Sequence, residues 1–175
     1  VGLNNKLDYV KLSSVTEVAV SEGGNIVFKK YDIKNLVGQT LKGITSGVTG
    51  TIVSTRYSTT TTSDTLYVNY TSSGNSNNES TFRQGETLEV VDGVNTPLMV
   101  VGTDGSVLPT SITLKDPDTD AETSYTSSAM GFASAVQVEE GIYFVNGHFV
   151  RNDAELIILE PYINIPSAKV GFKIS

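Results

Sequence analysis

The chain has 175 residues, a net charge of -7 at neutral pH, 16 glycines, and neither cysteine nor tryptophan. The lack of cysteine excludes disulfide bonds and thiolate metal sites, and the acidic balance disfavours binding along a nucleic-acid backbone, which needs clustered positive charge. No apolar run approaches the roughly 20 residues of a membrane-spanning helix. Abundant Thr, Ser, Val and Gly with few helix formers predict an all-β protein with many turns.

The first part of the chain consists of short apolar runs separated by polar turns. The chain begins at Val1 rather than Met, so we expect it to be a fragment or a processed piece of a longer protein. Residues 7–20 are predicted to form two strands broken at Ser13-Ser14, and residues 22–25 a turn. A further strand begins at Ile26, and residues 32–36 have room for one helical turn.

Residues 38–54 carry the clearest barrel signal. Closely spaced glycines between short β-branched runs predict the tight turns and bends of a small closed barrel. The tetrapeptides at 38–41 (GQTL) and 85–88 (GETL) match at three of four positions. We expect one turn-to-strand device used twice, with tandem repeats as the alternative. Residues 59–63 are predicted to be an exposed loop, and residues 72–79 a long polar loop.

The strongest turn signal lies at Asn146-Gly147, between two mainly apolar runs. Asn-Gly tolerates the positive φ angles of a type I′ turn, so the sequence predicts a β-hairpin with fixed register. The predicted pairs are Val145 with His148, Phe144 with Phe149, Tyr143 with Val150, and Ile142 with Arg151. Because side chains alternate between faces, both faces are largely apolar. We therefore expect each face to be covered by another sheet, a helix or a second copy of the chain.

His148 is the only histidine, which excludes a cluster of imidazole ligands. One histidine can serve a Ser-His-Asp triad, but the chain has no Gly-x-Ser-x-Gly elbow. We therefore expect His148 to be a structural strand residue. The sequence predicts no enzyme, no catalytic residue and no cofactor.

Asp116, Asp118 and Asp120 have the alternate spacing of calcium ligands. However, the sixth position of this candidate loop is Ala121 rather than Gly, and the twelfth is Ser127 rather than Glu. We expect a solvated acidic turn, with a bound cation as the alternative. Further carboxylates stand near predicted strands at Glu139, Glu140, Glu155 and Glu160. A glycosidase pair cannot be chosen among them, because its defining separation is spatial.

Eight tyrosines could build a sugar-binding surface together with the loops at 59–63 and 72–79. The simpler interpretation is that they are strand residues, since Tyr favours strands. The tyrosines are Tyr9, Tyr31, Tyr57, Tyr67, Tyr70, Tyr125, Tyr143 and Tyr162.

Three stretches in the last quarter of the chain resemble a domain of unknown function in tailed-phage virion proteins. They are residues 133–150 (ASAVQVEEGIYFVNGHFV), 158–162 (ILEPY) and 166–172 (PSAKVGF). The resemblance covers about residues 129–175, and the family occurs in baseplate and tail-fibre proteins of contractile-tailed phages, including cyanophages. A looser likeness to small β-barrel modules of such proteins covers residues 36–41 (LVGQTL), 46–53 (SGVTGTIV) and 82–88 (FRQGETL).

The resemblance implies a structural protein of a bacteriophage tail, made in the host bacterial cytoplasm and located in the virion. Its implied partners are other tail or baseplate proteins and further copies of the chain. The alternative is a carbohydrate-binding or adhesin module that contacts host-surface glycans. We expect a barrel module at residues 25–103, inserted or in tandem, and a β-sandwich-like antiparallel domain at 104–175. The strands of residues 1–24 are expected to complete that second domain.

Overall fold

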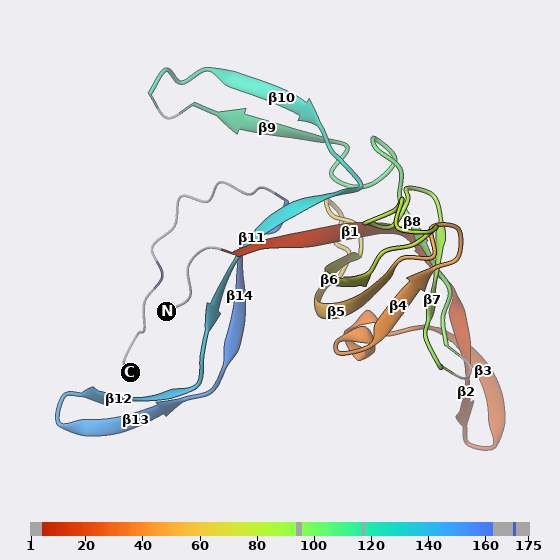
Figure 1. Ribbon diagram of the computed structural model, residues 1–175, viewed down its shortest axis with the longest axis horizontal. Helices are drawn as coiled ribbons and strands as arrows, with labels where there is room; N and C mark the ends of the chain where they lie inside the picture. Colours follow the sequence, from red (N-terminus) through yellow and green to blue (C-terminus); the bar gives the residue numbers. More distant parts are fainter. Residues whose placement is uncertain (1–4, 94–95, 117, 163–169, 171–175) are drawn as a thin grey trace. The chain divides into compact units, whose positions relative to one another are not determined.

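A computed structural model of the chain describes residues 5–93, 96–116, 118–162 and 170. The described residues form β-strands and one short 3-10 helix, so the predicted all-β class is confirmed (Figure 1). Two compact units result: Tyr9–Met130, and a second unit that combines Val1–Asp8 with Gly131–Ser175. These boundaries differ from the predicted division at residues 24 and 103.

The first unit contains most of the strands. They are β1 (Asn5–Val15, shared with the second unit), β2 (Glu17–Glu22), β3 (Asn25–Lys30), β4 (Thr40–Gly43), β5 (Thr49–Arg56), β6 (Thr65–Ser72), β7 (Thr87–Val90), β8 (Met99–Val101), β9 (Ser111–Lys115) and β10 (Glu122–Thr126). The predicted helical turn is the 3-10 helix η1 (Ile33–Leu36), which Asp32 caps by accepting the N–H of Lys34 at 2.9 Å.

Six of these strands close into an antiparallel barrel with the order β1-β6-β5-β4-β7-β8. Closure comes from the pairing of β1 with β8, in which Leu12 faces Val101 and Val15 faces Met99. The predicted barrel is therefore present, but it includes β1, which lies before the predicted start at residue 25. The predicted break at Ser13-Ser14 is a register shift between Leu12 and Ser14 within one continuous strand.

The barrel interior is filled with aliphatic side chains, as expected for a small barrel. The most completely buried ones come from strand positions, from η1 and from the connection just before β5, namely Val10, Ile33, Leu36, Leu41, Val48, Ile52, Leu66, Leu88 and Met99. These residues belong to one hydrophobic cluster. The apolar core therefore lies within the barrel, and the chain, which has no cysteine, forms it without a disulfide bond.

The repeated tetrapeptides form the same turn in two places. Gly38 and Gly85 both have positive φ angles, of 84° and 76°, which glycine adopts without steric cost. The N–H of Gly38 donates to the carbonyl of Ile52 at 2.7 Å, and that of Gly85 donates to Val101 at 3.1 Å. The expected turn-to-strand device used twice is therefore confirmed.

The two devices meet at the pairing of β4 with β7. The pairs are Leu41 with Val90, Lys42 with Glu89, and Gly43 with Leu88. Leu41 and Leu88 hold equivalent places in the two tetrapeptides. They lie on opposite sides of the Lys42–Glu89 pair. The arrangement is locally two-fold symmetric about that pair.

The second unit is built around one long hairpin. Its strands are β11 (Met130–Val138), β12 (Gly141–Val145), β13 (His148–Asn152) and β14 (Glu155–Glu160). Pairing of β12 with β13 continues, in the same register, into pairing of β11 with β14 from Val138–Glu155 to Ala135–Ile158. In Figure 1 the chain runs from β11 into β12 and returns through β13 into β14. The second domain is antiparallel as predicted, while a facing sheet of a β-sandwich is not among its described residues.

Candidate interaction surface

The tip of the long hairpin has the predicted geometry. Asn146 and Gly147 have φ angles of 51° and 85°, as a type I′ turn requires. The pairs are Val145–His148, Phe144–Phe149, Tyr143–Val150 and Ile142–Arg151, so the predicted register is confirmed at each pair.

The apolar side chains of this hairpin face solvent. Ile142, Phe144 and Phe149 are 71%, 66% and 79% exposed. The rings of Phe144 and Phe149 contact each other with centroids 5.1 Å apart. On the opposite face, Val150 and Tyr143 are also exposed. We name Ile142, Phe144 and Phe149 the apolar hairpin face.

The expectation that another sheet or helix covers both faces is wrong for the described part of this chain. The hairpin forms a two-stranded sheet of its own in which β12 pairs with β13 alone among the described strands. Sequence alternation identifies which side chains share a face, but it does not show what covers that face. Of the coverings considered, only a second copy of the chain is left.

Charged residues surround the root of the hairpin. Arg151 Nε lies 3.4 Å from Asp153 Oδ1, and its Nη2 lies 3.9 Å from Glu140 Oε2. Glu140, Gly141, Ile142 and Arg151 line an open hollow of about 320 Å³. An apolar tip next to a charged rim is the composition of a protein–protein contact surface.

A second exposed hairpin occurs in the first unit, where β2 pairs with β3 as a separate two-stranded sheet. Ile26 and Phe28 are 74% and 67% exposed. They face Ser21 and Ala19 on the paired strand, and so share one side of the ribbon. Two-stranded ribbons are marginally stable alone in water, which makes this hairpin a second candidate contact surface.

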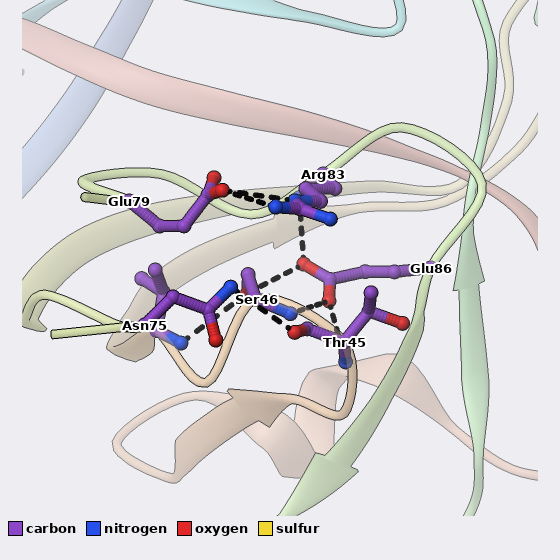
Figure 2. Close-up of polar contacts among 7 residues, drawn as sticks. Thr45, Ser46, Asn75, Glu79, Arg83 and Glu86 are labelled. Carbon is purple, nitrogen blue, oxygen red and sulfur yellow. Dashed lines mark hydrogen bonds and ion pairs between the residues drawn. The ribbon is translucent and has the colours of Figure 1, made fainter.

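The buried carboxylate of Glu86 accepts four hydrogen bonds in the first unit (Figure 2). Its Oε2 accepts the N–H groups of Thr45 and Ser46 at 3.1 and 2.9 Å. Its Oε1 accepts the Ser46 hydroxyl at 2.9 Å and the Arg83 N–H at 2.6 Å. The carboxylate therefore ties two loops together and has its acceptor capacity occupied, so we interpret it as a structural anchor.

The polar loop at residues 72–79 is tied to this anchor. Arg83 Nε donates to Glu79 Oε1 at 3.1 Å, and this bond lowers the pKa of Glu79. Asn75 Nδ2 donates to the Thr45 carbonyl at 3.4 Å (Figure 2). The predicted polar loop is exposed over most of its length, and contacts at Asn75 and Glu79 hold it in place. No sequence pattern indicates that the Glu86 carboxylate accepts hydrogen bonds from a residue 40 positions earlier in the chain.

Lys11 is a completely buried lysine on β1. Its Nζ donates to Ser127 Oγ and lies 5.7 Å from the Tyr9 ring centroid. Burial lowers the Lys11 pKa to about 8, against the opposing effect of the Asp104 charge. Lysine and serine are the residue types of a base–nucleophile pair. Because both side chains are fully buried, a substrate cannot reach them, and we assign the pair to structure.

The residues that the sequence marked for chemistry do not come together. His148 is an exposed residue on β13. Asp116 Oδ1 accepts the N–H groups of Asp118 and Thr119 at 2.8 and 3.3 Å, which lowers the Asp116 pKa. That carboxylate therefore closes its own turn. Among the residues that the structure describes, no group of three or more His, Asp or Glu side chains could hold a metal ion.

The remaining candidates are scattered. Glu139, Glu140, Glu155 and Glu160 are exposed along the long hairpin. Tyr9 and Tyr67 are buried, Tyr31, Tyr70 and Tyr162 are half-buried, Tyr57 and Tyr143 are exposed, and the Tyr125 side chain lies outside the described part of the structure. Tyr9 and Tyr67 are thus unavailable for a sugar-binding surface, whereas Tyr31 and Tyr57 line the same hollow in the first unit.

Comparison with known proteins gives no relative. No protein family, no curated protein and no solved structure was found to match the chain. Within the described residues, no helix has the length and apolarity needed to cross a lipid bilayer. Functional inference therefore depends on the surfaces and contacts of the chain itself.

Proposed function

We propose that this chain is a structural component of a bacteriophage tail, in the baseplate or a tail fibre, where it mediates assembly. The exposed apolar hairpin face carries the proposal, and the resemblance of residues 129–175 to tail-protein sequences supports it. The proposed partners are further copies of the chain and other tail proteins in the virion. The proposal assigns no catalytic activity to the chain.

Burial of the apolar hairpin face on a partner is energetically favourable. Fully burying one large apolar side chain stabilises by about 1.5–3 kcal/mol, and Ile142, Phe144 and Phe149 are all mostly exposed. Aromatic side chains are enriched at the centres of protein interfaces. A hairpin that carries two adjacent exposed phenylalanines therefore suits contact with another chain.

The backbone of the hairpin offers a second mode of attachment. In the two-stranded sheet of β12 and β13, each strand pairs with the other, and no further described strand pairs with either. The outer edge of each strand can therefore accept an added strand from a partner. Strand addition together with burial of the phenylalanines would give a partner both orientation and affinity.

The proposal is tested first by the mass of the chain in solution. We expect light scattering to give a mass above 18.7 kDa that rises with concentration, because copies associate through the hairpin. The double variant Phe144→Ser/Phe149→Ser should reduce the mass to that of one chain. The matched variant Ile44→Ser, which removes an exposed apolar side chain from the barrel unit, should leave the mass unchanged.

The second test concerns the virion. A cryo-EM map of the tail should contain density that fits the barrel and the long hairpin, with the apolar hairpin face at a contact with another chain. A strictly monomeric chain that has no corresponding density in the tail would overturn the proposal.

A further inference from the structure

The barrel unit contains a small hollow beside the polar loop of residues 59–63. Its lining residues are Lys30, Tyr31, Asp32, Ile33, Tyr57 and Asp64, and its volume is about 210 Å³. They come from the end of β3, the start of η1 and the two ends of the β5–β6 connection. Residues distant in the sequence are thus placed around one concave site.

The aromatic wall of the hollow is held in place before any ligand binds. The Tyr57 hydroxyl donates to Asp32 Oδ1 at 2.6 Å, and Lys34 Nζ lies 5.1 Å from the Tyr57 ring centroid. Tyr57 is nevertheless 45% exposed, and Tyr31 packs against the barrel core. A fixed and accessible aromatic ring is a suitable platform for an apolar face of a ligand.

The polar groups of the hollow are ionised and oriented. Burial raises the Asp64 pKa, but hydrogen bonds from Lys30 and the Ser58 N–H outweigh it and lower the pKa overall; the distances are 2.7 Å each. The hydrogen bond from Tyr57 lowers the Asp32 pKa, aided by the Lys34 N–H. Both carboxylates therefore remain acceptors at neutral pH.

Asp32 and Lys30 can each form a further hydrogen bond with a ligand. The hydrogen bonds to Asp32 go to Oδ1, and no described residue donates a hydrogen bond to its Oδ2. The Lys30 ammonium has three donors, one of which binds Asp64, and its side chain is 58% exposed. The site thus offers an acceptor and a donor beside an aromatic ring.

We propose that this hollow binds one neutral sugar ring. A pyranose has an apolar face that can lie on Tyr57 and hydroxyl groups that both donate and accept, which matches Asp32 and Lys30. The charges of Asp32 and Asp64 are balanced by Lys30 and Lys34, so neither an anionic nor a cationic ligand is favoured by net charge. Sites for drug-sized ligands measure about 300–1,000 Å³, and the smaller hollow here limits the ligand to a single ring.

This inference is independent of the assembly role, because it uses no residue of the hairpin. For so small a ligand we expect weak binding, with a dissociation constant on the order of 1–10 mM. Binding of a terminal sugar would gain strength from many copies displayed together.

The test is a titration of the labelled chain with methyl glycosides of glucose, galactose and N-acetylglucosamine, followed by amide ¹H–¹⁵N NMR spectra. At least one glycoside should shift the amide signals of Tyr31, Ile33 and Ser58 in a saturable way. Tyr57→Ala should weaken binding at least tenfold, whereas Tyr57→Phe, which keeps the ring, should weaken it only a few-fold. Tyr143→Ala, at an exposed tyrosine of the hairpin, should leave binding unchanged.

Several outcomes would overturn the sugar site. These are the absence of saturable shifts with all three glycosides, shifts confined to other residues, and equal binding by Tyr57→Ala. Shifts of the same amides by tetramethylammonium alone would indicate a cation cage instead. The amide signals of the barrel core report whether each variant is folded. If Tyr57→Ala does not fold, Tyr57→Phe still tests the site, because it should keep the same amide shifts with binding weakened only a few-fold.

Discussion

The barrel buries its apolar side chains, whereas the long hairpin leaves its largest ones exposed. In the barrel, Leu41, Ile52 and Leu88 are completely buried, and strand closure leaves no open edge. In the hairpin, Phe144 and Phe149 are mostly exposed on a ribbon of two strands. The barrel is therefore stabilised by its own core, whereas the hairpin has apolar surface available for another chain. The difference suggests that the closed barrel supplies stability and the long hairpin supplies contact.

The largest effect should come from the barrel core. Leu88→Ala should lower the free energy of unfolding by about 2–5 kcal/mol, because it removes buried methyl groups and leaves a cavity. Urea unfolding followed by circular dichroism measures this change. Leu98→Ala, at an exposed leucine of the same unit, is the control and should cost less than about 1 kcal/mol. Equal losses in the two variants would contradict the assigned core.

The buried lysine should make barrel stability depend on alkaline pH. The Lys11 pKa is about 8 in the folded chain and about 10.4 when unfolded, so the unfolded chain binds more protons between these values. Stability should therefore rise by about 3 kcal/mol from pH 7.5 to pH 10.5 relative to Lys11→Met. Unfolding both proteins in urea across this range isolates the lysine from other titrating groups. A difference between them that stays constant with pH would mean that Lys11 is not buried.

Glu86→Gln should lower the free energy of unfolding by about 1–3 kcal/mol. The carboxylate accepts its hydrogen bonds on two oxygens, whereas the amide of Gln has only one acceptor oxygen. Thermal or urea unfolding measures the loss. Glu89, on β7 just after Glu86, faces Lys42; Glu89→Gln should lower the free energy of unfolding by less than about 1 kcal/mol. Amide exchange at Ser46 should also accelerate in Glu86→Gln, and an unchanged rate would argue against the anchor.

The smallest effect on folding should come from the hairpin. Phe144→Ala should change the free energy of unfolding of the dilute chain by less than about 1 kcal/mol, since the side chain is mostly exposed. A buried phenylalanine would cost about 3–5 kcal/mol. A loss of that size in the monomer would show that the hairpin packs within its own chain, and would remove the contrast between the two units.

Local patterns predicted those features that depend on neighbouring residues. Asn146-Gly147 specified the turn and its register, because two positive φ angles leave few alternatives. The register then continues into β11 and β14, which was not foreseen, since Val138 and Glu155 lie far from the turn. The paired glycines Gly38 and Gly85 likewise marked equivalent turns.

Features that depend on distant contacts were not predictable. The sequence around Glu86 does not indicate that its carboxylate accepts hydrogen bonds from Thr45 and Ser46. Likewise, the sequence around Tyr57 does not indicate that its hydroxyl donates a hydrogen bond to Asp32. The apolar alternation of Phe144 and Phe149 defined a face but not its surroundings, because a face buried by a partner has the same pattern as one buried by the core.

Hydrogen exchange at two protein concentrations tests the contrast between the units most directly. In dilute solution the amides of β12 and β13 should exchange rapidly and those of β5 and β6 slowly. At high concentration, exchange in β12 and β13 should slow as the apolar hairpin face becomes covered, while exchange in the barrel should not change. Equal and concentration-independent protection of the hairpin and the barrel would contradict the account.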